Sequence, residues 1–244
     1  LTNAGMVSAA ELEGVIDRAL SQVDGRIALD DLRTLIESGG LEEWLNGLGK
    51  DLHDKTYQPQ PVRRVMIPKP NGGERPLGIP TIRDRVVQSA AKLVVEPIFE
   101  ADLEPNAYGY RPRRSAQDAV RKVHELLVQG YTDVLDADLS KYFDTIPHAE
   151  LMQCVARRIS DRRVLHLIKM WLTAAVMQQD DRGNWQNLGR NRQGTPQGGV
   201  ISPLLANLYL NRFLKYFRLQ GKSKIWRAEI VSYADDFVIL TQRS

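Results

Sequence analysis

The chain has 244 residues, with 33 Lys and Arg against 30 Asp and Glu, a formal net charge of +3 and a pI of about 9.0. This length allows one substantial core or two modest ones, and the mild positive charge permits a nucleic-acid partner without requiring one. A single cysteine, Cys154, excludes an internal disulfide and a thiolate zinc cluster. The composition therefore favours a cytoplasmic protein, and the lack of an apolar run near the roughly 20 residues of a bilayer span argues against a membrane segment.

Residues 1–56 predict a helical N-terminal extension. Ser8 to Glu11 form a capping box that opens a helix, and two further amphipathic stretches follow, near Leu29 to Ile36 and around Trp44. We interpret these helices as packing or dimer contacts, which makes a homodimer a candidate assembly.

Lys69 and Arg75 flank the turn signal Pro70-Asn71-Gly72-Gly73, which predicts a hairpin tip with one cation on each side. A long helix is expected from Thr81 to about Glu100. Further helices are expected to open at Ser115 and at Asp161.

Residues 131–139 alternate as a β-strand that places Leu135 and Ala137 on one face, with Asp136 and Asp138 together on the other. Two acidic side chains on one face repel each other unless something positive lies opposite. A solvated edge strand is the alternative interpretation. Tyr142 and Phe143 follow where the strand gives way to a turn, which is unusual for an exposed edge.

Arg182-Gly183-Asn184 predicts a second hairpin, and a glycine-containing loop, residues 193–201, leads from it into a helix. We expect Ser202 as the N-cap of that helix and Pro203 as its first position. Its apolar residues Leu204, Leu205, Leu208 and Phe213 are expected in the core.

Tyr233-Ala234-Asp235-Asp236 lies between two strand-like runs. Adjacent aspartates are poor strand formers, so they belong at the connection of a hairpin. A hairpin tip with two carboxylates predicts a site for a divalent metal.

Five segments in this order resemble successive blocks of reverse transcriptases, most nearly the group II intron-encoded type: Ile67 to Pro80, Tyr108 to Pro112, Asp138 to Asp144, Gln193 to Asn207, and Tyr233 to Asp236. The resemblance implies an α+β fold, the fingers and palm of a right-hand polymerase, in which helices pack a small antiparallel palm sheet. It implies fingers with the first palm elements over 57–130, and a palm with an interleaved fingers segment over 131–244. Relatives continue into a thumb, so this chain alone is expected to have weak duplex affinity and little or no activity.

The resemblance implies an RNA-directed DNA polymerase that uses two Mg²⁺ ions. In that reading Asp138 and Asp235 bridge the ions, Asp236 lies beside them, and the Leu139 carbonyl is a further ligand. Asp136 lies next to this set without ligating directly.

The same resemblance assigns contacts to the incoming nucleotide and the template. Lys69 and Arg75 are expected at the triphosphate, and Phe143 under the sugar, where its ring excludes a ribose 2′-hydroxyl. Gln197 and Gly198 are expected at the sugar and base pair.

Cations clustered between hydrophobic segments suit a phosphate backbone, and we expect template contacts from Arg63 and Arg111. Asp144 is expected to cap the turn before a helix near Pro147 to Leu151.

The partners implied are an RNA template and primer, dNTPs and a group II intron RNA. One alternative is an RNA-binding maturase, a splicing cofactor in which polymerase chemistry is incidental. Another is a related reverse transcriptase that serves phage defence or CRISPR spacer acquisition.

Overall fold

The computed structural model describes residues 40–69, 72–180 and 182–242. The two helices expected before residue 40 lie outside this range, and the third is confirmed as α3 (Leu41–His53). The chain divides into two compact units, each described here by itself. Unit 1 comprises Leu1–Ala91, Ala174–Arg190 and Gly198–Val200, and unit 2 comprises Lys92–Thr173, Asn191–Gln197 and Ile201–Ser244.

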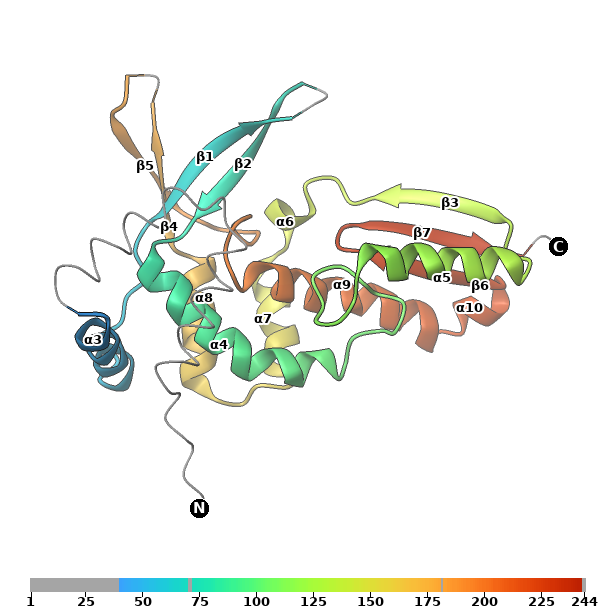
Figure 1. Ribbon diagram of the computed structural model, residues 1–244, viewed down its shortest axis with the longest axis horizontal. Coiled ribbons are helices and arrows are strands. Elements are labelled where there is room, and N and C mark those ends of the chain that lie inside the picture. The colour runs from blue at the N-terminus through green and yellow to red at the C-terminus, as the bar shows by residue number, and fades with distance from the viewer. Residues whose placement is uncertain (1–39, 70–71, 181, 243–244) are drawn as a thin grey trace, which may run out of the picture. The chain divides into compact units, whose positions relative to one another are not determined.

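Unit 1 is built on a four-stranded mixed sheet of order β2-β1-β4-β5 (Figure 1). Its strands are β1 (Val62–Pro68), β2 (Glu74–Ile79), β4 (Ala175–Gln179) and β5 (Trp185–Arg190), and the first half of α4 (Ile82–Glu100) belongs to the same unit. Both predicted hairpins are confirmed, as the antiparallel pairs β1–β2 and β4–β5. The parallel pairing of β1 with β4, which joins the hairpins into one sheet, was not anticipated from the sequence.

A buried carboxylate ties the N-terminal turn of α4 to the segment before β1. Asp84 is 1% exposed and accepts hydrogen bonds from the Tyr57 hydroxyl at 2.7 Å, the Thr81 hydroxyl at 2.8 Å and the Gln60 amide at 3.0 Å. Three donors offset the cost of removing this carboxylate from water.

Unit 2 contains the three-stranded antiparallel sheet β3-β7-β6, which confirms the small antiparallel sheet predicted for the palm. Its strands are β3 (Asp133–Asp138), β6 (Ala228–Tyr233) and β7 (Asp236–Thr241). Its helices, besides the second half of α4, are α5 (Ala116–Val128), α6 (Tyr142–Thr145), α7 (His148–Ala156), α8 (Arg162–Leu172), α9 (Ser202–Leu219) and α10 (Lys222–Ile225).

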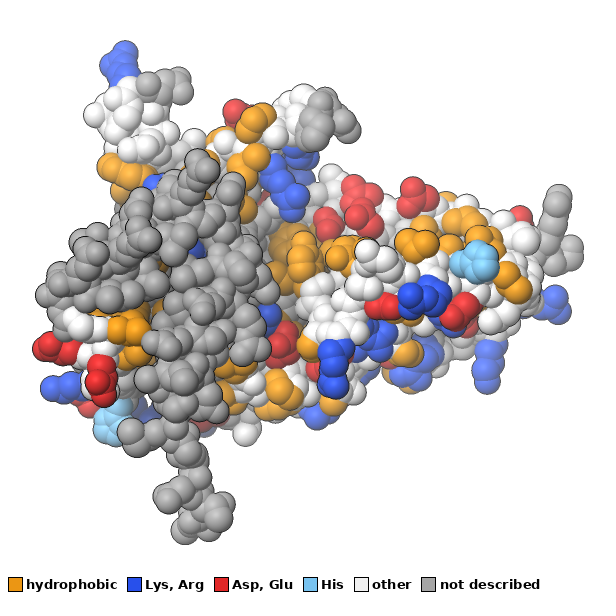
Figure 2. Space-filling model, in the orientation of Figure 1, with side chains coloured by type: hydrophobic (Ala, Val, Ile, Leu, Met, Phe, Trp, Pro, Cys, Tyr) orange, Lys and Arg blue, Asp and Glu red, His pale blue; other side chains and the backbone are white. Residues whose placement is uncertain are grey.

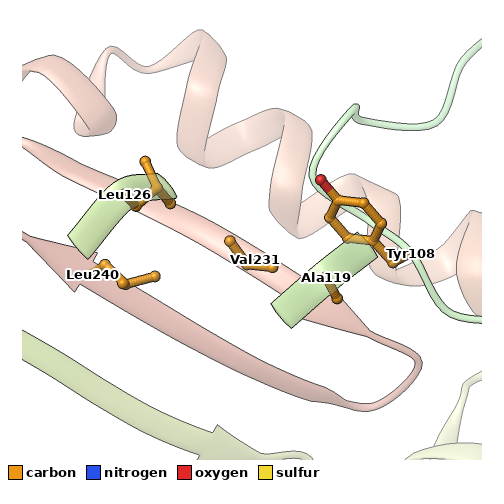
Figure 3. Close-up of a cluster of buried hydrophobic side chains, with 5 residues drawn as sticks. All are labelled: Tyr108, Ala119, Leu126, Val231 and Leu240. Atoms are coloured by element: carbon orange, nitrogen blue, oxygen red, sulfur yellow. The ribbon is translucent and has the colours of Figure 1, made fainter. Parts of the chain in front are cut away.

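Helices α5 and α9 pack on opposite faces of this sheet. Ala119 and Leu126 of α5 lie against Val231 and Leu240, and together with Tyr108 they form a buried cluster (Figure 3). On the other face, the ring of Phe213 in α9 lies 5.7 Å from that of Phe237, between centroids. Strand alternation accounts for both contacts, because Phe237 and Leu240 point to opposite sides of β7.

Local signals predicted the starts of α5 and α8 in unit 2. Ser115 makes the capping box at α5, and the Asp161 side chain caps α8. The expectation for α9 was one residue off, because Ile201 is the N-cap and Ser202 is already helical. Phe213 is 40% exposed and lies at the margin of the core, not inside it. No helix in the described ranges is long and apolar enough to cross a lipid bilayer.

Candidate active site

The two carboxylate segments meet at one end of the unit 2 sheet. Asp138, the last residue of β3, is the direct cross-strand partner of Asp236, the first residue of β7. Directly opposed residues of an antiparallel pair lie on the same face with Cα atoms about 4.5–5.5 Å apart. Asp136 pairs with Val238 two positions along, so alternation places it on that same face. The predicted meeting of distant aspartates is thus present in the fold.

Asp235 lies in the tight turn that joins β6 to β7. Tyr233 pairs with Asp236, which leaves Ala234 and Asp235 as the connecting residues. Ala234 adopts a left-handed conformation with φ 57, a geometry that short hairpin connections favour. The turn projects Asp235 at the end of the sheet where Asp138 and Asp236 lie.

The carboxylates at this end of the sheet lie close enough to repel one another. Burial raises the pKa of Asp236 above its ordinary value, and the nearby charges of Asp235, Asp138 and Asp136 raise it further. Acidic side chains gather along the edge of the molecule that β3 forms (Figure 2), where Asp136 and Asp138 are exposed. A group of carboxylates that disfavours its own ionisation is stabilised by a cation.

The donor set is chemically suited to a hard divalent cation. Carboxylate and carbonyl oxygens are the ligands that Mg²⁺ prefers. The Leu139 carbonyl directly follows Asp138 and accepts one hydrogen bond, from the Tyr142 amide at 3.1 Å, so a second lone pair remains. Within the described ranges, no three His, Cys, Asp or Glu side chains already stand in a metal-binding arrangement. The carboxylate and carbonyl oxygens therefore suit Mg²⁺ by their type, and the pairing of β3 with β7 brings them to one end of the sheet.

Phe143 lies in the short helix α6, directly beyond Leu139. Its ring is 5% exposed and packs edge-on against Tyr110 and Tyr142, with centroids 6.2 Å and 5.9 Å away. The core interpretation of this aromatic is therefore confirmed, and a role beneath a nucleotide sugar stays a prediction.

The loop before α9 is attached to α6 and the start of α7 by several short contacts. The Thr195 amide donates to the Phe143 carbonyl at 2.7 Å, and the Gly194 amide donates to the Ile146 carbonyl at 2.7 Å. The Gly194 carbonyl accepts from Nε2 of His148 at 2.7 Å, which requires the Nε2–H tautomer. These bonds fix the loop that carries Gln197.

The expectation that Asp144 caps the next helix is corrected. α7 begins after Pro147, and no side chain caps it. Asp144 instead lies within α6, and its carboxylate oxygens are 3.5 Å and 3.4 Å from Nε2 of Gln197, which donates to them. Asp144 thus contacts the side chain expected at the nucleotide.

In unit 1, the β1–β2 hairpin presents the two expected triphosphate cations. Lys69 and Arg75 are both exposed near its tip, and the Lys69 amide donates to the Gly73 carbonyl at 3.0 Å. Gly198 packs on the same hairpin, since a Cβ there would lie 2.8 Å from the Gly78 carbonyl oxygen. Arg63 is half-buried on β1, where it pairs with Ile79 on one side.

Arg111 has a structural role in unit 2. It is 8% exposed, and its guanidinium donates to both carboxylate oxygens of Glu100, at 2.6–3.1 Å, and to the carbonyls of Glu104 and Ala107, both at 2.7 Å. The expectation of a template contact is corrected on this ground, because these donors already hold the segment that follows α4.

The geometry and the sequence blocks agree with a known family. The family model described as "Reverse transcriptase (RNA-dependent DNA polymerase)" matches residues 67–244. The chain belongs to the reverse transcriptase family. The recognition of this family from five ordered segments is thereby confirmed.

Relatives of this reverse transcriptase include intron-encoded proteins. It is 41% identical over 217 residues to "Protein YkfC" of Escherichia coli (strain K12), which covers 76% of this chain and 55% of that protein. It is 38% identical over 190 residues to "Group II intron-encoded protein LtrA" of Lactococcus lactis subsp. cremoris, with coverage of 78% and 30%. "Nuclear intron maturase 1, mitochondrial" of Arabidopsis thaliana is 29% identical over 205 residues, with coverage of 62% and 29%. The chain thus spans about half or less of the curated relatives it matches.

Solved structures support the fold of this reverse transcriptase. A telomerase from Candida Tropicalis, determined in complex with a TWJ fragment of telomeric RNA, superposes with a TM-score of 0.60 over 82% of this chain and 40% of that chain. An apo form truncated from the C-terminal domain gives 0.59 over 83% and 49%. At 12% and 13% identity, these likenesses show the polymerase fold alone.

Two residues close to the β6–β7 hairpin were not singled out from the sequence. Gly109 lies in the segment Tyr108 to Pro112, and Asn207 ends the segment from Gln193. Both belong to blocks that carry the family resemblance, which was the available signal, but nothing local shows that they touch each other.

Proposed function

We propose that this chain catalyses RNA-directed DNA synthesis by two-metal nucleotidyl transfer. The observation that carries the proposal is the cross-strand pairing of Asp138 with Asp236, beside the turn that bears Asp235. Membership of the reverse transcriptase family supports the reaction class. Relatives that are group II intron-encoded proteins support the intron type.

Asp138 and Asp235 would hold two Mg²⁺ ions, with Asp236 beside them and the Leu139 carbonyl as a further oxygen ligand. Two such ions, when bound, activate the primer 3′-hydroxyl and stabilise the charge of the departing pyrophosphate. The protein contributes geometry here, because β3 and β7 fix the carboxylates on a hydrogen-bonded sheet and not on a free loop.

The remaining nucleotide contacts follow from charge and shape. Lys69 and Arg75 would neutralise the triphosphate of an incoming dNTP, since an exposed cation suits phosphate oxygens. Phe143 would close the floor under the deoxyribose. Gln197 and Gly198 would contact the sugar and base pair, where the glycine lets the backbone approach closely.

Arg63 remains our proposed template contact, from β1 of unit 1. The division into an extension over 1–56, fingers over 57–130 and palm over 131–244 also remains a proposal. We further propose a cytoplasmic protein with a homodimer as candidate assembly. Because longer relatives match only in part, we expect little processive synthesis from these 244 residues alone.

A second function, assistance to intron splicing, is favoured by the similarity to an intron maturase and to group II intron-encoded proteins. The RNA partner would then be a group II intron. Both functions are compatible with one chain, because RNA binding does not require the carboxylates.

The test compares the complete gene product with its Asp235→Ala, Asp236→Ala double variant. Primer extension on an RNA template should be abolished, while RNA affinity stays within about threefold because the carboxylates carry no phosphate contact. Asp133→Ala is the matched control, since Asp133 lies on the neighbouring strand β3 and pairs with Thr241, at the end of the sheet away from Asp235 and Asp236. Robust extension by the double variant would reject the proposal, and splicing assistance that persists in it would establish a separate maturase function.

A further inference from the structure

Helix α9 holds an irregular segment of unit 2 through two asparagines one turn apart. Asn211 accepts from the Glu104 amide at 2.9 Å and donates to the Asp102 carbonyl at 2.9 Å. Asn207 donates from Nδ2 to the Gly109 carbonyl at 2.7 Å. Residues four apart lie on one face of a helix, so the two side chains grip successive parts of the same segment.

The part held by Asn207 lies directly against the β6–β7 hairpin, which is called the catalytic hairpin below because it carries Asp235 and Asp236. Gly109 is buried, and a Cβ on it would be 2.1 Å from the Ala234 amide nitrogen and 2.9 Å from the Tyr233 carbonyl carbon. No side chain fits between this backbone and the turn that carries Asp235. The position of Gly109 therefore sets how closely the turn can approach the rest of the unit.

Backbone hydrogen bonds align the same segment with β6. The Tyr108 amide donates to the Ser232 carbonyl at 2.8 Å, and the Ser232 amide donates to the Asn106 carbonyl at 3.0 Å. On the C-terminal side of Gly109, an ion pair with Glu100 fixes Arg111. A displacement of the Gly109 backbone thus reaches the hairpin with little slack between them.

We infer that Asn207 is a positioning residue for the catalytic hairpin, and that it acts through the Gly109 carbonyl. Its hydrogen bond keeps the Gly109 backbone in contact with Ala234. This contact in turn keeps Asp235 where it can bind the same metal ions as Asp138. Asn211, with more hydrogen bonds to the same segment, serves stability alone. The inference rests on the proposed polymerase function for its catalytic readout, but not for its structural one.

The two asparagines provide a matched pair for the test. In the complete gene product, Asn207→Leu should lower kcat about ten- to a hundredfold and raise the Mg²⁺ concentration for half-maximal rate, with the KM for dNTP changed less than about threefold. Asn211→Leu removes two hydrogen bonds, so it should lower the Tm more than Asn207→Leu does while it leaves the Mg²⁺ dependence unchanged. Asn207→Ser is a milder variant for the case that the leucine variant does not fold, and it should shift the Mg²⁺ dependence in the same direction.

Hydrogen exchange separates this inference from the proposed function. Asn207→Leu, or Asn207→Ser, should speed amide exchange in the peptide over residues 232–238, and Asn211→Leu should speed it over 102–105 only. Equal effects of both asparagines on the hairpin, or none from Asn207, would overturn the inference even if the wild type extends primers. An inactive wild type with the predicted exchange pattern would instead reject the proposed polymerase function and keep the positioning contact.

Discussion

Asp138 and Asp236 face each other across the β3–β7 ladder, although they are 98 positions apart in the sequence. The pairing brings a carboxylate from one strand end to the hairpin that carries the other two. It also places like charges next to each other, and the stability of this end should therefore depend on pH and on cations.

The first prediction concerns Asp236. Its pKa is raised in the folded protein, so folding takes up a proton between the ordinary and the raised value, and stability increases as the pH falls through the raised pKa. Asp236→Asn should raise the Tm at pH 7, and the gain in the free energy of unfolding should be less than about 1 kcal/mol because water screens the group. The gain should shrink as the pH approaches the ordinary Asp range. Thermal melts of both proteins at pH values from about 4 to 8 measure this gain in Tm. A gain that grows on acidification would contradict the predicted pH dependence.

Phe143 gives a prediction on sugar selection. Phe143→Leu should reduce the preference for dNTP over rNTP about tenfold or more, because a smaller side chain no longer excludes the 2′-hydroxyl. The control is Phe99→Leu, since Phe99 is 0% exposed in the same unit and should lose stability similarly, by about 1–3 kcal/mol. Single-nucleotide incorporation assays compare the two variants. Unchanged selectivity in Phe143→Leu would leave this ring with a packing role only.

Two glycines with similar backbones separate strain from steric overlap. Gly194 has φ 78, and a Cβ there would lie 2.6 Å from the Phe143 carbonyl oxygen. Gly183 has φ 82, and a Cβ there would have no heavy atom of the described residues within 4 Å. Gly183→Ala should cost about 1 kcal/mol from backbone strain alone. Gly194→Ala should cost more and should also raise the KM for dNTP, because it displaces the loop that carries Gln197. Equal losses of stability in both variants would show that the close approach is unimportant.

Neighbouring buried charges on α4 predict opposite effects on stability. Asp84→Ala removes the acceptor of three hydrogen bonds and should lower the free energy of unfolding by about 3 kcal/mol. Arg85 is 6% exposed, its Nε has no hydrogen-bond partner in the described ranges, and burial lowers its pKa. Arg85→Met should therefore leave stability unchanged or increase it. Urea unfolding of both variants is the measurement, and a loss from Arg85→Met as large as that from Asp84→Ala would contradict this.

The site could be predicted where local pattern determines geometry. Alternation alone placed Asp136 and Asp138 on one face, and two adjacent acids marked the turn at Asp235. The edge-strand alternative for β3 is also correct as far as it goes, because β3 is an edge of its sheet and carries the carboxylates as well.

Other features depend on partners that no local pattern reveals. Arg111 has the same sequence signature as a solvent-facing cation, and only the fold shows that it turns back to Glu100. The parallel pairing of β1 with β4 joins segments more than a hundred residues apart, and no single turn connects the two strands. The contact of Gly109 with Ala234 likewise depends on packing. The sequence shows a glycine at this position but does not show which segment it contacts.

Anomalous diffraction from crystals of the complete gene product soaked in Mn²⁺, which substitutes for Mg²⁺ on oxygen ligands, tests whether Asp138 and Asp235 bind the same metal ion. We expect a peak within about 2.0–2.3 Å of carboxylate oxygens from both Asp138 and Asp235. The same peak should be lost in Asp138→Asn crystals. A peak that contacts only one of the two aspartates, or the absence of any peak at this end of the sheet, would show that they do not share a metal ion.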